Sequence, residues 1–160
     1  MSALNQIHFA LVFVALLGSG LIAGVFFAFS AFVMKALVRL PPAEGIATMQ
    51  SINITVLNRW FLGVFLGTGV VCVLLLFWSL ILWDQEGSVH LIMGCAFYLV
   101  GCVMVTGIFN VPKNEEIAKV SPLTAESEQL WHSYVDKWTS WNHVRTGASL
   151  LAAACFGLSL

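Results

Sequence analysis

The chain has 160 residues, of which 59% are hydrophobic and 9% are charged, and its formal net charge is −1 at pH 7. Soluble domains carry about 25% charged residues, so this composition excludes an ordinary soluble protein and predicts an all-α membrane protein. The small net charge argues against a nucleic-acid partner. The length leaves room for a single membrane domain spanning residues 1–160.

Four apolar runs predict the transmembrane helices, at about residues 7–33, 60–83, 91–109 and 141–160. The first run holds no Asp, Glu, Lys or Arg, and about 20 apolar residues suffice to cross the hydrocarbon core of a bilayer. It also lacks the positive start and the short apolar stretch of a cleaved signal peptide. We therefore expect a bundle of four transmembrane helices that is embedded in a lipid bilayer.

Prolines and glycines indicate where these helices end and touch. Residues 41 and 42 are both Pro, which predicts that the first helix ends there. Gly20 and Gly24, and again Gly63 and Gly67, form pairs four residues apart. Such pairs let helix backbones approach closely in a membrane, so we expect them to pack inside the bundle rather than in a dimer. The sequence leaves the oligomeric state open.

Positive charge predicts the orientation of the bundle. All Lys and Arg residues lie in the segments 34–59 and 110–145, and the gap 84–90 has none. Because cytoplasmic loops hold positive charge, the loops 34–59 and 110–140 should be cytoplasmic and both termini non-cytoplasmic, in a plasma membrane or the inner membrane of a bacterium. We expect the transmembrane helices to extend into these cytoplasmic segments. Residues 43–59 extend the second helix, and a helix that starts near residues 121–122 runs unbroken into the fourth.

An aromatic stripe precedes the last apolar run. On a helix of 3.6 residues per turn, one arc of about 100° collects Trp131, Tyr134, Trp138, Trp141, Asn142 and Arg145, and His143 falls about 100° from Asn142. This pattern is typical of a membrane-interface belt anchored by arginine. It also suits an aromatic pocket for a small planar ligand, in which the arginine contacts aromatic faces or an anionic oxygen. Spacing alone leaves both interpretations open.

Asparagines cluster at the same predicted level of the membrane. Asn53 and Asn58 precede the second apolar run, and Asn110 and Asn114 follow the third. They are candidates to line a ligand site together with the stripe. The competing interpretation is ordinary capping of helix ends, which we prefer for Asn114.

The sequence predicts no metal site and no cofactor. His8 and His90 belong to the outer side, and His132 and His143 are about 16 Å apart along one helix, at 1.5 Å per residue. The four cysteines lie inside apolar runs without a Cys-x-x-Cys pair, so we expect buried and inert thiols.

Four blocks of residues are similar to those of a known family. They are GVFFAFS at 24–30 with VM at 33–34, MQSIN at 49–53 with LNRWF at 57–61, NVPKN at 110–114, and WHSY at 131–134 with Trp138 and WNHVRT at 141–146. With these blocks the chain resembles the anthrone oxygenase-like (DUF1772) family of small four-helix membrane proteins. The last two blocks are the specific ones. Lys35 and Arg59 stand where family members often have Pro.

The resemblance implies a chemistry. Characterised relatives oxidise anthrones to anthraquinones with molecular oxygen and without a known metal or flavin. Arg145 and Asn142 would then stabilise an oxyanion, while Tyr134 and the stripe tryptophans would stack on flat rings. His143 is the expected base, because histidine is the usual proton acceptor near neutral pH. The rival hypothesis is a non-catalytic membrane protein that binds a lipid, a quinone or a partner helix.

Overall fold

The computed structural model describes residues 3–81 and 87–160, which are helical apart from short turns. Segments written η are π-helical. In chain order the elements are α1 (Ala3–Ala28), η1 (Phe29–Val33), α2 (Met34–Val38), α3 (Pro42–Thr55), α4 (Arg59–Ile81), α5 (Ser88–Ala96), η2 (Phe97–Met104), η3 (Thr106–Asn110), α6 (Val111–Ala118) and α7 (Ala125–Leu158). The described part is thus all-helical, as predicted. The predicted end of the second run, at residue 83, lies outside the described residues.

The first and third long helical stretches are interrupted by π-helical segments. The helical stretch Ala3–Val38 passes through η1, and Ser88–Ala118 passes through η2 and η3. The third therefore continues past Pro112, where we had placed a loop. A proline lacks the N–H that an α-turn would use, and the wider turn of η3 directly before it changes the hydrogen-bond register. Single π turns in α-helices are frequent at functional sites.

We had predicted that residues 43–59 extend the second helix, but the structure shows a break in this segment. α3 begins at Pro42, directly after the turn that ends α2, and it ends at Thr55; α4 starts at Arg59. Asn58 makes the break because its side-chain Oδ1 accepts hydrogen bonds from the backbone N–H groups of Trp60 (3.0 Å) and Phe61 (3.1 Å). An asparagine in this role caps the first turn of α4. α3 can therefore lie beside the bundle at its own angle.

α7 is the long, unbroken last helix that we predicted. It begins at Ala125, after Thr124, whose side chain accepts a hydrogen bond from the backbone N–H of Ser127. It then runs for 34 residues. Its buried and exposed residues follow the predicted faces: Trp131, Tyr134, Trp138, Asn142 and Arg145 are buried, whereas His132, Asp136 and His143 are exposed.

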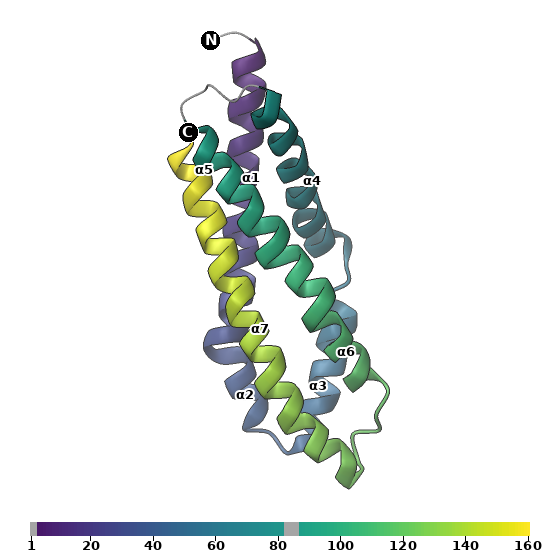
Figure 1. The fold of residues 1–160 in the computed structure, drawn as a ribbon. Coiled ribbons are helices and arrows are strands. Elements are labelled where there is room, and N and C mark those ends of the chain that lie inside the picture. Colours follow the sequence, from purple (N-terminus) through teal and green to yellow (C-terminus); the bar gives the residue numbers. More distant parts are fainter. Residues whose placement is uncertain (1–2, 82–86) are drawn as a thin grey trace.

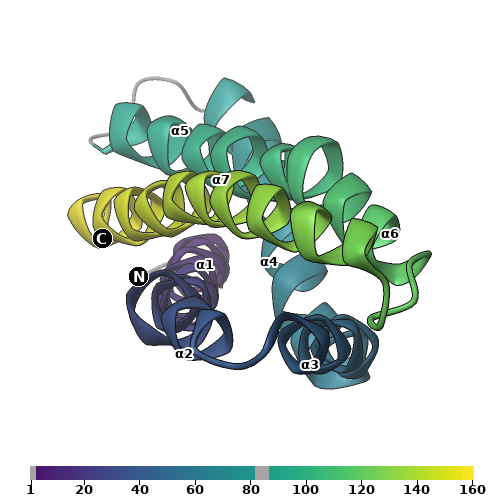
Figure 2. The ribbon, with the colours of Figure 1, turned by 90° about the horizontal axis from the view of Figure 1, so that it is seen from below.

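α7 lies in the middle of the molecule. It packs against α1 on one side and against α5 and η2 on the other (Figures 1 and 2), and α4 packs against α1 and α5. α1 begins and α7 ends at the same end of the molecule, while α2, α3 and α6 gather at the opposite end (Figure 1). The lower half of α7 is therefore surrounded by segments that lie far apart in the sequence.

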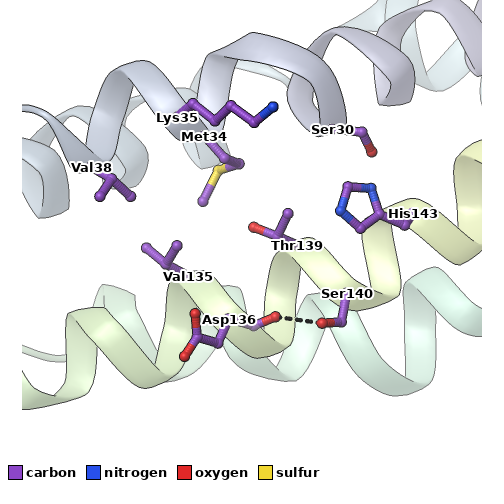
Figure 3. Close-up of a pocket in the computed structure, with 9 residues that line it drawn as sticks. All are labelled: Ser30, Met34, Lys35, Val38, Val135, Asp136, Thr139, Ser140 and His143. Carbon is purple, nitrogen blue, oxygen red and sulfur yellow. Dashed lines mark hydrogen bonds between the residues drawn. The ribbon is translucent and has the colours of Figure 1, made fainter.

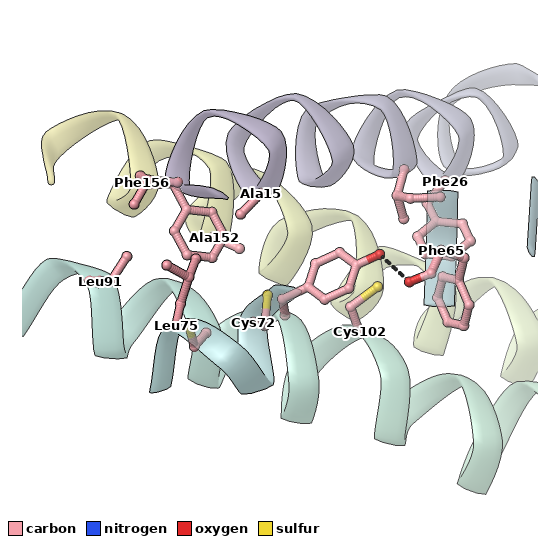
Figure 4. Close-up of a cluster of buried hydrophobic side chains, with 13 residues drawn as sticks. Ala15, Phe26, Phe65, Cys72, Leu75, Leu91, Cys102, Ala152 and Phe156 are labelled. Carbon is pink, nitrogen blue, oxygen red and sulfur yellow. Dashed lines mark hydrogen bonds between the residues drawn. The ribbon is translucent and has the colours of Figure 1, made fainter. Parts of the chain in front are cut away.

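Two apolar clusters form the core. The upper one joins α1, α4, α5, η2 and α7 (Figure 4). At its centre lies Tyr98 of η2, whose phenol donates a hydrogen bond to the backbone oxygen of Phe65 (3.0 Å). The lower one joins α2, α3, α6 and α7 around Trp131 and Tyr134. All four cysteines are free and buried, as predicted. The space between the two clusters holds the polar residues described below.

The glycine pairs do not make the close contacts that we predicted. A Cβ atom added at Gly20, Gly24, Gly63 or Gly67 would meet no atom within 4 Å, so these faces point out of the bundle. The close contacts occur at other glycines. A Cβ at Gly101 would lie 2.5 Å from Cβ of Ala148, and a Cβ at Gly94 would lie 2.7 Å from the ring of Phe156. These two positions let η2 and α5 approach α7.

Three helical stretches are long and apolar enough to cross a membrane: Ala3–Val38, Arg59–Ile81 and Ser88–Ala118. Their outer faces expose large apolar side chains such as Phe27, Leu66 and Leu74, as expected for a surface in contact with lipid. The chain therefore has the character of an integral membrane protein. α7 is not among the three, so the predicted fourth crossing stays a prediction.

The orientation of the bundle can be tested at the C-terminus. From the distribution of Lys and Arg we predict that residue 160 is non-cytoplasmic. A reporter that folds only in the cytoplasm should be silent when fused after Leu160, and the same reporter inserted after Lys119 should be active. An active reporter at Leu160 would contradict the four-crossing topology.

Candidate functional site

A cavity of about 190 Å³ lies between the two apolar clusters. Its walls come from α1 and η1, from α3 and α4, from η3 and α6, and from α7. Most of the lining is apolar, and its aromatic members are Phe26, Phe29, Phe61, Phe65 and Trp138. The cavity thus offers flat aromatic faces, which stack well on planar rings.

Arg145 brings the only charge to this cavity among the residues that line it. Its side chain is 4% exposed, and its Cζ atom lies 4.1 Å from the ring centre of Phe26 and 5.1 Å from that of Trp138. Contacts of this kind with aromatic faces favour a cation. α7 places Trp138 and Arg145 two turns apart on the same buried face.

Among the residues that the structure describes, no carboxylate pairs with Arg145. The ion pair found among them joins Lys113 and Glu116, which do not line the cavity. The guanidinium instead donates to neutral oxygens, namely Oδ1 of Asn142 (2.7 Å) and Oγ1 of Thr106 (3.3 Å). Burial of an unpaired charge costs several kcal/mol. A charge kept inside a membrane protein at that cost marks a functional site by default.

Asn142 holds the arginine in place rather than facing the cavity. Its Nδ2 donates to the backbone oxygen of Phe26 (2.7 Å) and to Oγ of Ser30 (2.8 Å), and its Oδ1 accepts from Arg145. Both ends of the amide are therefore occupied. The predicted oxyanion contact from Asn142 is not what the structure shows; Asn142 instead links Arg145 to the junction of α1 and η1.

Two buried donors of the cavity have no partner. They are Nε of Arg145 and Nδ2 of Asn53, and both residues line the cavity. Buried donors are nearly always hydrogen-bonded in folded proteins. An acceptor oxygen that carries negative charge would suit either of these groups, since a charge-assisted hydrogen bond is stronger than a neutral one.

Asn114 joins α6 to the aromatic stripe of α7. Its Oδ1 accepts hydrogen bonds from Trp138 Nε1 (2.8 Å) and from the Tyr134 phenol (3.0 Å). Our preference for helix capping at Asn114 was therefore wrong, because its side chain makes tertiary contacts. Burial raises the pKa of the Tyr134 phenol, so that this group stays protonated and acts as a donor at neutral pH.

His143 lies outside the cavity, on the opposite face of α7. It belongs to an open groove of about 470 Å³ between the η1–α2 segment and α7. Figure 3 shows it there together with Lys35 and Asp136. Its imidazole is exposed. The structure thus separates the residue that we expected to act as base from Arg145 and Trp138.

The remaining predicted residues lie around the cavity. Trp131 belongs to the lower apolar cluster, and Trp141 stacks on Phe109 with ring centres 3.6 Å apart. Asn110 is buried, and its Nδ2 donates to the backbone oxygen of Trp138 (3.1 Å). Asn58 is the exposed cap of α4. Among the predicted residues, Asn53, Asn114, Trp138 and Arg145 line the cavity itself.

Sequence reasoning missed two residues that contact Arg145. Phe26 lies under the guanidinium, and Thr106 accepts its hydrogen bond. Phe26 is one of several phenylalanines in an apolar run, and nothing in the spacing distinguishes it from Phe27, which is exposed. Thr106 lies within the third apolar run, where its own hydroxyl also donates to the backbone oxygen of Cys102 (2.7 Å).

A comparison with known families decides the classification. The family described as anthrone oxygenase matches residues 57–155, which is more than half of the chain. The chain belongs to the anthrone oxygenase family. The matched region includes Thr106, Asn114, Trp138 and Arg145, whereas the parts of the cavity from α1 and α3 precede it. The search of curated proteins and the search of solved structures gave no match.

Within residues 3–81 and 87–160, no three His, Cys, Asp or Glu side chains gather as a metal site would require. The polar groups that do gather are the guanidinium, two amides and a hydroxyl. The N–H groups of Arg145 and Asn53 that have no partner are the donors among them suited to an anionic oxygen.

Proposed function

We propose that the cavity binds a planar phenol as its anion and that the protein oxidises this ligand with molecular oxygen, without a cofactor. The observation that carries the proposal is Arg145, a buried cation with no carboxylate partner among the described residues. Membership of the anthrone oxygenase family supports the reaction class.

In this proposal Arg145 performs the main electrostatic task. A cation next to a phenol or an enolisable ketone favours the ionised form and lowers the pKa of the ligand. The unpartnered N–H groups of Arg145 and Asn53 would donate to the resulting oxyanion. Phe26 and Trp138 would hold the rings by stacking. The ionised ring is electron-rich at the carbon opposite the oxygen, which is where oxygen adds.

The atoms balance for an anthrone. The ring carbon opposite the carbonyl loses two hydrogens and gains one oxygen atom from O2, and the second oxygen atom leaves as water together with both hydrogens. The carbanion supplies the electron pair for the new carbon–oxygen bond, and loss of water from the hydroperoxide gives the quinone. The proton that the ligand loses on ionising beside Arg145 passes to water and is returned when water leaves the hydroperoxide, so no protein base is required at the carbon.

A non-catalytic binding protein is the second candidate. The observation that favours it is that no carboxylate or imidazole is found among the described residues of the cavity lining. A binder for a lipid, a quinone or a partner helix needs no proton acceptor, and the same stacking and anion-binding groups would serve it.

Oxygen uptake decides between the two candidates. Purified protein in lipid nanodiscs should consume oxygen when anthrone or 1-naphthol is added, and each quinone should carry one labelled oxygen atom from labelled O2. Arg145→Gln should lower the rate by about a hundredfold or more. The matched control is His143→Gln on the opposite face, which should retain the wild-type rate. Binding without turnover would overturn the oxygenase proposal in favour of the binder, and loss of turnover in His143→Gln would show that the base lies in the groove of Figure 3.

A further inference from the structure

The cavity is closed above and below by the two apolar clusters. Above it, Phe26 and Phe65 belong to the upper cluster, with exposed fractions of 4% and 6%. Below it, Met49 and Trp138 belong to the lower cluster, at 0% and 5%. The lower cluster lies between this part of the cavity and the end of the molecule where α2, α3 and α6 gather (Figure 1). A ligand has no open path along the axis of the bundle through these close-packed side chains.

The exposed residues that line the cavity lie on one side of it, at α4 and α6. Three lining residues are exposed, and all are aliphatic: Leu57 (67%), Leu66 (52%) and Val111 (39%). Leu57 lies in the turn between α3 and α4, Leu66 lies on α4, and Val111 begins α6. α4 packs firmly against α5 and η2 but at most weakly against η3 and α6. The cavity therefore opens between α4 and α6.

This opening faces the region that lipid would occupy. α4 is one of the three candidate membrane spans and begins at Arg59. Leu66 lies seven residues further along, which is about 10 Å at 1.5 Å per residue. Leu66 at this depth is wetted by acyl chains, whereas Leu57 and Val111 lie near the membrane surface, so the rim runs from the interface into the hydrocarbon region. An ionised ligand would be disfavoured there, and a neutral one would pass.

We propose that the ligand enters from the bilayer, as a neutral phenol that passes between α4 and α6 at a portal formed by Leu57, Leu66 and Val111. The inference rests on the proposed function, because it assigns the ligand class to the same cavity. The ligand ionises only after it reaches Arg145.

A residue at the portal can be distinguished by kinetics from a residue that contacts the bound ligand. A bulky side chain on the rim obstructs entry and exit alike, so the association and dissociation rates of a ligand fall together and their ratio, the Kd, is unchanged. A residue that touches the bound ligand changes the Kd instead. The probe is 1-naphthol, whose own fluorescence reports its transfer into the protein, and the protein is held in nanodiscs of phosphatidylcholine.

Leu66→Trp should lower both rates of 1-naphthol about tenfold with an unchanged Kd. Leu74→Trp is the matched control, because Leu74 is equally exposed (52%) on the same helix but does not line the cavity. Leu57→Trp, with Ile54→Trp as its control (75% exposed), repeats the test in case Leu66→Trp does not fold. Equal rates in all variants, or a change of Kd alone, would overturn the portal. If wild-type protein binds no 1-naphthol at all, the proposed function fails instead.

Discussion

Arg145→Met is expected to make the protein more stable and at the same time unable to bind a phenolate. The methionine fills a similar space without charge, so the desolvation cost of several kcal/mol disappears. The loss of the hydrogen bond to Asn142 leaves Oδ1 of that amide unpaired, which costs about 1–3 kcal/mol. The first term is the larger, so the free energy of unfolding should rise by about 1–3 kcal/mol. Binding of 1-naphtholate should fall about a hundredfold or more.

A gain in stability with a loss of binding is the mark of a group kept for function. Thermal unfolding in detergent measures the first effect and the fluorescence of 1-naphthol the second. Arg145→Lys is the companion variant. It keeps the charge but lacks the planar fork that donates to Asn142 and to a ligand together, so binding should fall about tenfold while stability stays near wild type. Unfolding of Arg145→Met would mean that the arginine is a structural part of the bundle.

Gly101→Val should destabilise the protein by about 3 kcal/mol, at the upper end for an overpacked core. The added Cβ would lie 2.5 Å from Cβ of Ala148 on α7. Neither atom can turn away, because both are attached directly to helix backbone, so η2 must separate from α7. That separation would also widen the gap between the helices that carry Thr106 and Arg145, which share a hydrogen bond.

Gly107→Val provides the control for this packing effect. Gly107 lies in the same helical stretch, and a Cβ there would meet no atom within 4 Å. The same substitution should therefore change stability by less than about 1 kcal/mol. Gly20→Val and Gly24→Val should be similarly mild, because their Cβ positions are also open. Equal losses at Gly101 and Gly107 would show that the cost comes from the valine itself rather than from contact with α7.

Part of the candidate site follows from the sequence because it lies on one helix. The period of 3.6 residues places Trp138, Asn142 and Arg145 on one face of α7 and His143 on another, and burial in the structure follows that division. The same reasoning could not tell which buried residues touch the cavity. Trp141 lies at the edge of the predicted face and stacks on Phe109 instead.

The asparagines show the limit of local reasoning. Asn58 and Asn114 look alike in the sequence, each near the end of an apolar run. The structure makes Asn58 the cap of α4 and turns Asn114 toward Trp138. The difference depends on whether another helix covers the residue. The residues next to either asparagine in the sequence do not indicate whether another helix will pack over it.

The helical class, the apolar surface, the free buried cysteines and the buried face of α7 all follow from the amino-acid sequence alone. These properties depend on composition and on a period along one segment, and local physical chemistry sets both. The meeting of Phe26, Asn53, Thr106 and Arg145 around one cavity is visible only in the folded chain. They come from four separate helical segments, so their meeting depends on how the segments pack and on the π turns and the break before α4, which shift the faces of the helices relative to one another.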